Sequence, residues 1–130
     1  MTLALGGEYL GSCFIQPRDF YTSQNVNVLI PNKEISYNAK LFISIIIFKE
    51  ARTYYKAFVD ELNRHIKTDF SILLPVNDEG KIDWNFIENY IKVIKENTLE
   101  RIEVLRDIVL YYLVLIFLYY SNNNHILICK

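Results

Sequence analysis

The fold is decided by the stretch Ser71-Ile72-Leu73-Leu74-Pro75-Val76-Asn77-Asp78-Glu79-Gly80-Lys81-Ile82-Asp83-Trp84-Asn85-Phe86-Ile87-Glu88-Asn89-Tyr90-Ile91. The apolar run at residues 70–74 predicts a short strand that ends at Pro75, because proline cannot donate to a strand ladder. The Asn-Asp-Glu-Gly sequence at 77–80 predicts a turn, in which Gly80 can take a positive φ. Asp83 predicts the N-cap of a helix that begins at Trp84.

That helix is predicted to run from residue 84 to about residue 120, with an apolar stripe on one face and charges on the other. Residues 108–120 are uncharged and strongly apolar. Thirteen residues are too few for a bilayer span, which needs about 20. Packing against another helix or subunit is therefore favoured over a membrane-anchored peptide, and residues 121–130 are predicted to form a tail.

The N-terminal part predicts a small sheet and one helix. Gly6, Gly7 and Gly11 interrupt the opening stretch, and strands are predicted at 12–16 and 26–30. A helix is predicted over 37–67 with Ser36 as its N-cap, although its Ile-rich part is also compatible with a strand. The fold class is α/β (α+β), with residues 1–82 as one domain and 83–120 as the long helix.

Composition limits the function classes. The chain has 130 residues, 52% of them hydrophobic, which predicts one folded domain. A net charge of −1 lacks the positive excess of a self-sufficient DNA binder, so DNA contact would need local patches or a partner. Cys13, Cys129, His65 and His125 are isolated and show no metal-site spacing. These thiols, with no signal-peptide pattern, predict a reducing, cytoplasmic location.

The sequence shows no catalytic constellation. It has no nucleophile elbow and no glycine-rich loop for a phosphate or a methyl-donor cofactor. Asp78, Glu79 and Asp83 are close in sequence, but a solvated turn and an N-cap explain them better than a metal site. We therefore predict a non-catalytic protein without a metal or cofactor.

Residues 16–25 form a loop rich in side chains that contact base edges. Arginine suits guanine, glutamine and asparagine suit adenine, and serine and threonine suit either. The alternative is an ordinary polar turn whose side chains satisfy the backbone, and composition alone favours that alternative.

Two groups of basic residues are further candidates for nucleic-acid contact. Lys49, Arg52 and Lys56 fall on one face of the predicted helix at i, i+3 and i+7, where they could follow phosphates or form a solvated face. Asn63-Arg64-His65 and Lys67 lie at the predicted end of the same helix. There, cations also complement the helix dipole, which is the slightly better interpretation.

Three segments resemble a known family. They are Gly11-Ser12-Cys13-Phe14-Ile15-Gln16-Pro17 with the following residues to Leu29, the helix at 41–54, and residues 73–91. Together they resemble a target-recognition domain of the specificity subunits of restriction–modification systems, BcgI-like and type I. The resemblance implies sequence-specific binding of double-stranded DNA without catalysis. The DNA-facing residues would be Gln16, Arg18, Tyr21, Ser23, Gln24 and Asn25, with Trp84, Phe86 and Tyr90 anchoring the helix.

The resemblance also implies partners. The long helix would dock on a methyltransferase or endonuclease subunit of the same system, or join a homo-oligomer. The chain departs from the family pattern where it starts nearly at the glycines and where residues 111–120 are apolar, so a truncated or rearranged copy is expected. This kinship requires two structural features: a paired strand at 70–74 and a long helix that begins at Trp84. The competing hypothesis is a helix-mediated interaction module that contacts no DNA.

Overall fold

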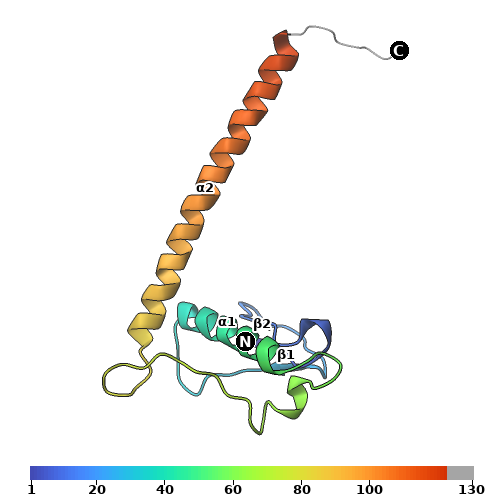
Figure 1. Ribbon diagram of the computed structural model, residues 1–130, viewed down its shortest axis with the longest axis vertical. Coiled ribbons are helices and arrows are strands. Elements are labelled where there is room, and N and C mark those ends of the chain that lie inside the picture. Colours follow the sequence, from blue (N-terminus) through green and yellow to red (C-terminus); the bar gives the residue numbers. More distant parts are fainter. Residues whose placement is uncertain (123–130) are drawn as a thin grey trace. The chain divides into compact units, whose positions relative to one another are not determined.

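The computed structural model describes residues 1–122 as a small sheet with helices, which confirms the α+β class (Figure 1). The chain divides into two compact units, Met1–Lys92 and Val93–Lys130. The predicted domain boundary at 82/83 stays a prediction. In chain order the elements are β1 (Thr2–Ala4), η1 (Gly7–Tyr9), β2 (Cys13–Phe14), β3 (Val26–Val28), α1 (Tyr37–Tyr54), η2 (Leu62–Arg64) and α2 (Trp84–Asn122).

The sheet has the order β2-β1-β3, with both neighbours antiparallel to β1. Thr2 pairs with Phe14 on one side and with Val28 on the other. The strands predicted at 12–16 and 26–30 are present but shorter. The central strand β1, which precedes Gly6, was missed. Three residues of β1 are too few to show a period-two pattern, yet fully buried Leu3 makes β1 part of the core.

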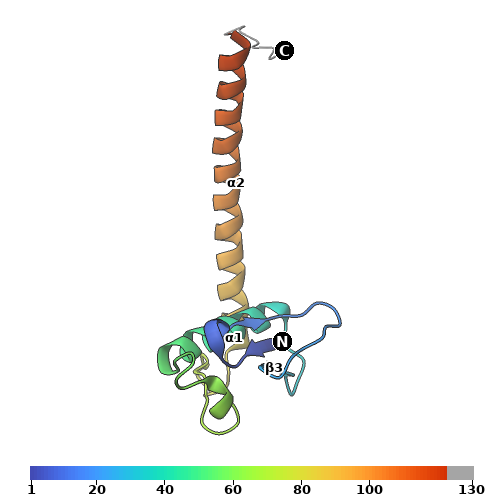
Figure 2. The ribbon, with the colours of Figure 1, turned by 90° about the vertical axis from the view of Figure 1, so that its right-hand side faces the viewer.

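Helix α1 begins as predicted, because the Ser36 hydroxyl oxygen accepts from the Ala39 amide at 3.0 Å. It lies beside β2 and buries Ile47 and Ala51 against the sheet (Figure 2). The prediction of a helix to residue 67 was wrong, because α1 ends at Tyr54 and Tyr55 is extended.

The connection after α1 is held by long-range contacts that a helical continuation would lose. One Glu61 carboxylate oxygen accepts from the Gly7 amide at 2.7 Å and from the Phe58 amide at 3.2 Å. Phe58 has a φ of 63°, a left-handed conformation that costs about 1–3 kcal/mol in a non-glycine residue. Leu62 is fully buried in the same core as Leu3. Leu62 therefore reaches the core without a helix, whereas Phe58 is 76% exposed.

The strand predicted at 70–74 was also wrong. Phe70 and Ile72 pack on the core that contains Leu3, while Leu74 packs against a second core and Leu73 is 86% exposed. The segment alternates as a strand does, but within residues 1–122 no strand pairs with it. The pattern predicted which side chains are buried, whereas ladder partners depend on the rest of the sheet.

The turn and the start of α2 are as predicted. The Asn77 side-chain oxygen accepts from the amides of Glu79 and Lys81, and Gly80 has a φ of 72°. The Asp83 carboxylate accepts from the Phe86 amide at 2.9 Å, as an N-cap does. An antiparallel bridge between Val76 and Ile82 closes the turn.

The first two turns of α2 pack on the N-terminal part of α1. Ile87 and Ile91 form the second core with Ala39 and Phe42. At the edge of this core the Glu88 carboxylate accepts from the side chains of Ser36 and Asn38, at 2.5 and 2.6 Å. The cap of α1 is thereby tied to α2.

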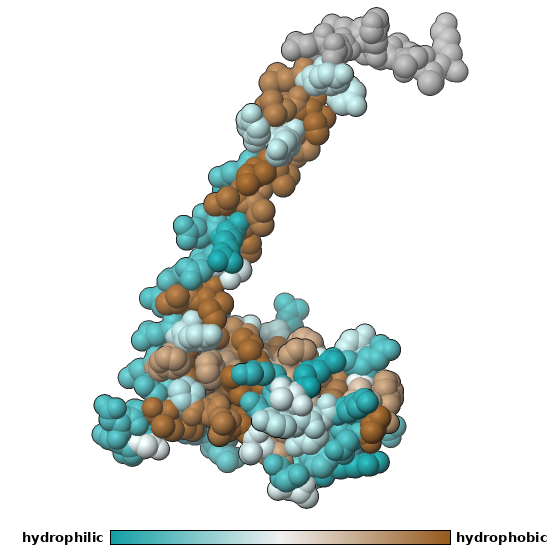
Figure 3. All heavy atoms as spheres, viewed as in Figure 1, coloured by the Kyte–Doolittle hydropathy of each residue, from teal (hydrophilic) through white to brown (hydrophobic). Residues whose placement is uncertain are grey.

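In the second unit, α2 exposes apolar side chains throughout residues 108–120, with exposed fractions from 43% to 72%. The face drawn in Figure 3 is mostly hydrophobic along this part of α2, with paler patches between. Of the predicted tail at 121–130, Ser121 and Asn122 belong to α2, and the rest lies outside the described residues.

Candidate nucleic-acid interface

The loop at 16–25 connects β2 to β3, the two edge strands of the sheet (Figure 2). All ten of its residues are exposed, and Tyr21 is fully so. Aromatic side chains of this size are normally half-buried or more, so full exposure of Tyr21 is a feature of contact surfaces.

Part of this loop surrounds a surface pocket of about 440 Å³. Gln16, Tyr21 and Ser23 line it together with Thr2 of β1. The Gln16 amide nitrogen donates to the Thr2 hydroxyl at 2.9 Å, which ties the loop to the central strand. Two further bonds shape its end: the Thr22 hydroxyl donates to the Val26 carbonyl at 3.3 Å, and the Val26 amide donates to the Ser23 carbonyl at 3.1 Å.

The other predicted loop residues lie outside this pocket. Arg18, Gln24 and Asn25 are exposed on the same loop. The Asn25 carbonyl accepts from the Leu5 amide at 3.0 Å, so its backbone is anchored while its side chain faces solvent. The six candidates thus share one exposed loop, and three of them share a pocket.

The predicted basic stripe is broken. Lys56 lies beyond the end of α1, where its backbone pairs with Asp60, so it does not share a helical face with Lys49. The Arg52 guanidinium donates to the Glu8 carbonyl at 2.7 Å and lies 5.3 Å from the centre of the Phe48 ring. Arg52 therefore ties α1 to η1, and Lys49 is exposed on α1.

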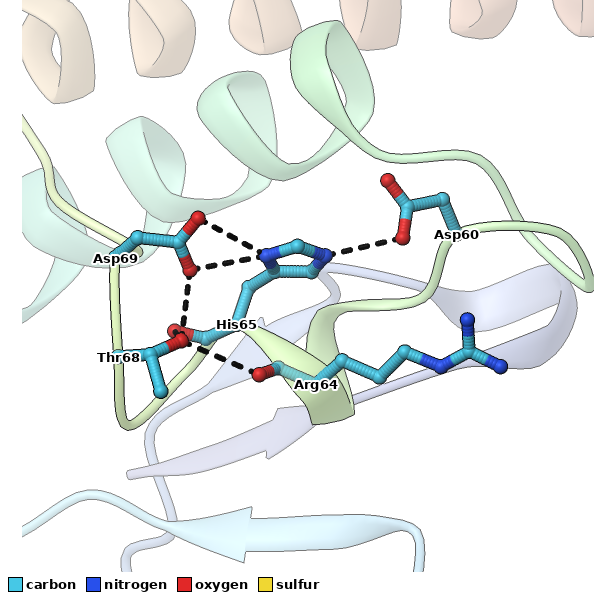
Figure 4. Close-up of polar contacts among 5 residues, drawn as sticks. All are labelled: Asp60, Arg64, His65, Thr68 and Asp69. Carbon is cyan, nitrogen blue, oxygen red and sulfur yellow. Dashed lines mark hydrogen bonds and ion pairs between the residues drawn. The ribbon is translucent and has the colours of Figure 1, made fainter.

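A cluster around His65 was missed by the sequence analysis (Figure 4). His65 Nε2 lies 3.0 Å from Asp60, and its Nδ1 lies 2.9 Å from Asp69. The Thr68 hydroxyl donates to Asp69 at 2.8 Å. The prediction that His65 complements the end of α1 was wrong, because the helix ends ten residues before Arg64. The sequence signal for this cluster was the close spacing of Asp60, His65 and Asp69. Their geometry depends on the turn at 61–69, which the sequence analysis did not predict.

The electrostatics of this cluster favour a protonated imidazole. Hydrogen bonds from the imidazole to the carboxylates of Asp60 and then Asp69 raise the pKa of His65 above its ordinary value. Hydrogen bonds from Thr68 and then His65 lower the pKa of Asp69. Burial, and then the charges of Asp69 and Asp60, raise the pKa of Tyr55, whose ring lies 4.7 Å from the imidazole. This arrangement joins two carboxylates through one imidazole ring and ties the connection together.

Comparison with protein families supplies the decisive observation. The model of the type I restriction modification DNA specificity domain matches residues 1–104, which is most of the chain. The chain belongs to this family of DNA specificity domains. The prediction from the sequence resemblance is therefore confirmed.

A curated relative of this specificity domain is the specificity subunit S.BcgI of the type II restriction enzyme BgcI from Heyndrickxia coagulans. It is 28% identical over 91 residues, which are 70% of this chain and 26% of that subunit. The chain spans about a quarter of the length of the curated relative that it matches. No solved structure matches the chain.

The family match also revises one condition set by the sequence. Kinship with the specificity subunits was predicted to require a paired strand at 70–74. The described residues contain no such strand. The specificity-domain match covers this segment nonetheless, and Phe70, Ile72 and Leu74 are partly buried in alternation. The second condition, a long helix from Trp84, is met.

Two features are absent from the part of the specificity domain that the structure describes. Among residues 1–122, no three histidine, cysteine, aspartate or glutamate side chains are placed to hold a metal ion. In the same part of the chain, no helix has both the length and the apolarity that crossing a bilayer requires. Cys13 is a free, half-buried thiol whose pKa is raised by burial, and Cys129 lies outside the described residues.

Proposed function

We propose that this chain is a non-catalytic DNA sequence-recognition module of a restriction–modification system, in which the loop at 16–25 reads base edges in the major groove. The observation that carries the proposal is the loop itself. In a family of DNA specificity domains, ten consecutive residues are exposed between the edge strands. They include arginine, glutamine, asparagine, serine and threonine, the side chains that pair with base edges.

The charge of the first unit indicates that a partner supplies part of the affinity. Residues 1–92 hold ten Lys and Arg against eleven Asp and Glu, so they lack the excess that neutralises phosphates. We propose that α2 docks on a methyltransferase or endonuclease subunit of the same system, which adds phosphate contacts and carries the chemistry. This places the complex in the cytoplasm, where cellular DNA lies.

The test is a gel-shift competition with the cognate modification subunit present. The complex should bind a subset of a random duplex library at least about a thousand-fold tighter than bulk duplex, as specific DNA binders do. The chain alone should bind weakly at physiological salt. A complex with no preference among random duplexes would contradict the proposal.

A matched pair of variants localises the recognition. Arg18→Ala removes an exposed cation from the loop, and Lys81→Ala removes one directly after the turn at 77–80. Arg18→Ala should relax the preference at one base position by about 1–3 kcal/mol, the value of a good bidentate contact. Lys81→Ala should leave the preference unchanged. Equal effects of both variants would place recognition outside the loop.

A second candidate function is assembly through α2 without DNA contact. Exposed apolar surface at residues 108–120 favours it, because large exposed apolar patches mark interaction sites. Preference among duplexes separates the two functions, since an assembly module would show none with its partner bound.

A further inference from the structure

The contact between Thr2 and Gln16 joins the exposed loop to the most protected part of the sheet. Thr2 is 7% exposed and belongs to β1, the central strand. Its hydroxyl donates to the Phe14 carbonyl at 3.4 Å and accepts from Gln16 Nε2 at 2.9 Å. Thr2 and Phe14 are also paired in the sheet register, so the acceptor of the hydroxyl proton is fixed by the backbone.

This contact decides which way the Gln16 amide points. A hydroxyl has one proton to donate, and the Thr2 proton goes to Phe14. The hydroxyl can therefore only accept from Gln16, which places the amide nitrogen toward Thr2 and Oε1 away from it. One N–H donor and the Oε1 acceptor of the amide then remain for a ligand.

That pair of groups complements one base. In the major groove, adenine presents N7 as an acceptor beside the N6 amino donor, whereas guanine presents two acceptors. Building on the proposed function, we propose that Gln16 reads an adenine in the major groove and that Thr2 is its positioning residue. An exposed glutamine otherwise loses side-chain entropy when it is ordered on binding. Thr2 orders Gln16 before DNA arrives, which is the general basis of preorganised recognition.

The experiment uses the full chain with its modification subunit, and a set of duplexes in which each base pair of the bound site is changed in turn. Gln16→Ala should lower discrimination at one A·T pair by about tenfold or more and leave other positions unchanged. Thr2→Val keeps the shape of the side chain but removes the acceptor. It should lower discrimination at the same pair, with affinity for unrelated duplex unchanged. Thr2→Ser keeps the hydroxyl and should restore wild-type discrimination.

A charge variant gives an independent outcome that does not depend on substitution in the sheet. Gln16→Glu presents acceptors only, so preference at that position should move from adenine toward cytosine, whose N4 group donates. Gln16→Glu also carries the test alone if Thr2→Val fails to fold, which circular dichroism would reveal.

Three results would overturn the inference, and they differ from failure of the proposed function. If Gln16→Ala and Gln16→Glu leave discrimination unchanged at every position while Arg18→Ala alters it, Gln16 does not read a base. The proposed function of the module would then stand without Gln16. If Thr2→Val weakens all positions equally, Thr2 has only a structural role. A wild-type complex with no duplex preference would overturn both proposals.

Discussion

Gly11 occupies a position where the backbone angle and the packing both exclude a side chain. Its φ is +79°, and an added Cβ would lie 2.5 Å from the Cβ of fully buried Ala51. Gly80 has a similar φ of +72°, but no atom lies within 4 Å of an added Cβ. The two glycines therefore separate the cost of the left-handed backbone from the cost of a steric clash.

Substitution of each glycine by alanine should show this difference. Gly80→Ala should lower the free energy of unfolding by about 1–2 kcal/mol, the backbone cost. Gly11→Ala should lower it by about 1–3 kcal/mol more, because a packed core resists an added group. Urea unfolding followed by the fluorescence of Trp84, the single tryptophan, measures both. Equal losses would mean that β2 and α1 shift apart at no cost.

At the scale of elements, the connection between α1 and the turn at 77–80 is the part whose stability should depend on pH. Both nitrogens of His65 face carboxylates, and the imidazole side chain is 24% exposed. An imidazolium donates to both, whereas a neutral imidazole turns a lone pair toward one of them. The charged groups beside the ring are Asp60 and Asp69. The Tyr55 ring is tilted against the imidazole by 44°, and Glu50 lines the adjoining pocket.

The direction of the pH effect follows from the two pKa shifts. The raised pKa of His65 stabilises the fold fully below its ordinary value of 6.5, and this contribution is lost as pH rises through the raised value. The lowered pKa of Asp69 stabilises the fold fully above the ordinary value of 3.8. This contribution is lost as pH falls through the lowered pKa. The cluster is therefore strongest between about pH 4 and 6.5.

His65→Gln should reveal this window. The urea midpoint of the wild type should exceed that of the variant most at pH 5.5, and the gap should narrow by pH 8.5. Lys67→Gln, which removes an exposed neighbouring cation, serves as the control and should show no such narrowing. A gap that is constant with pH would show that the imidazole contributes by packing alone.

Elements with local signals could be predicted from the sequence, and those fixed by distant partners could not. The caps at Ser36 and Asp83 and the turn at Asn77 use hydrogen bonds within four residues, so their residue types identify them. The end of α1 has no such signal, because Glu61 holds the connection through Gly7, 54 positions away. Apolar periodicity therefore predicted α1 up to Tyr54, but beyond it Leu62 reaches the core without a helix and Phe58 is exposed.

The candidate site shows the same division. The composition of the loop at 16–25 identified exposed polar side chains, because turns between strands are polar and lie at the surface. The tie between Gln16 and Thr2 could not be predicted, since it requires β1, which is too short to leave a pattern. Lys56 does not lie on the predicted basic stripe, because α1 ends at Tyr54.

At the scale of the whole molecule, the apolar segment at 108–120 concerns assembly. Thirteen consecutive uncharged residues of a helix point in every direction around its axis, because successive residues turn by about 100°. A single partner helix covers one stripe, so a surface that is apolar all round needs several neighbours. Self-association through α2 or docking between helices of a modification subunit would supply them.

Replacement of Leu113 and Phe117 by glutamate should abolish any such assembly, because burying two carboxylates in an apolar interface is costly. Both residues are exposed, at 55% and 71%, so the double variant should still fold as a unit. The control is Ile30→Glu with Leu73→Glu, which adds the same charge at two positions of the first unit that are 81% and 86% exposed.

We expect light scattering to give an oligomer for the wild type and the control, and a monomer for the Leu113→Glu, Phe117→Glu variant. If the wild type is itself a monomer, the same pair of variants is compared for capture by the modification subunit, where only the first should lose binding. An unchanged size together with unchanged capture would show that the apolar face of α2 is not an assembly surface.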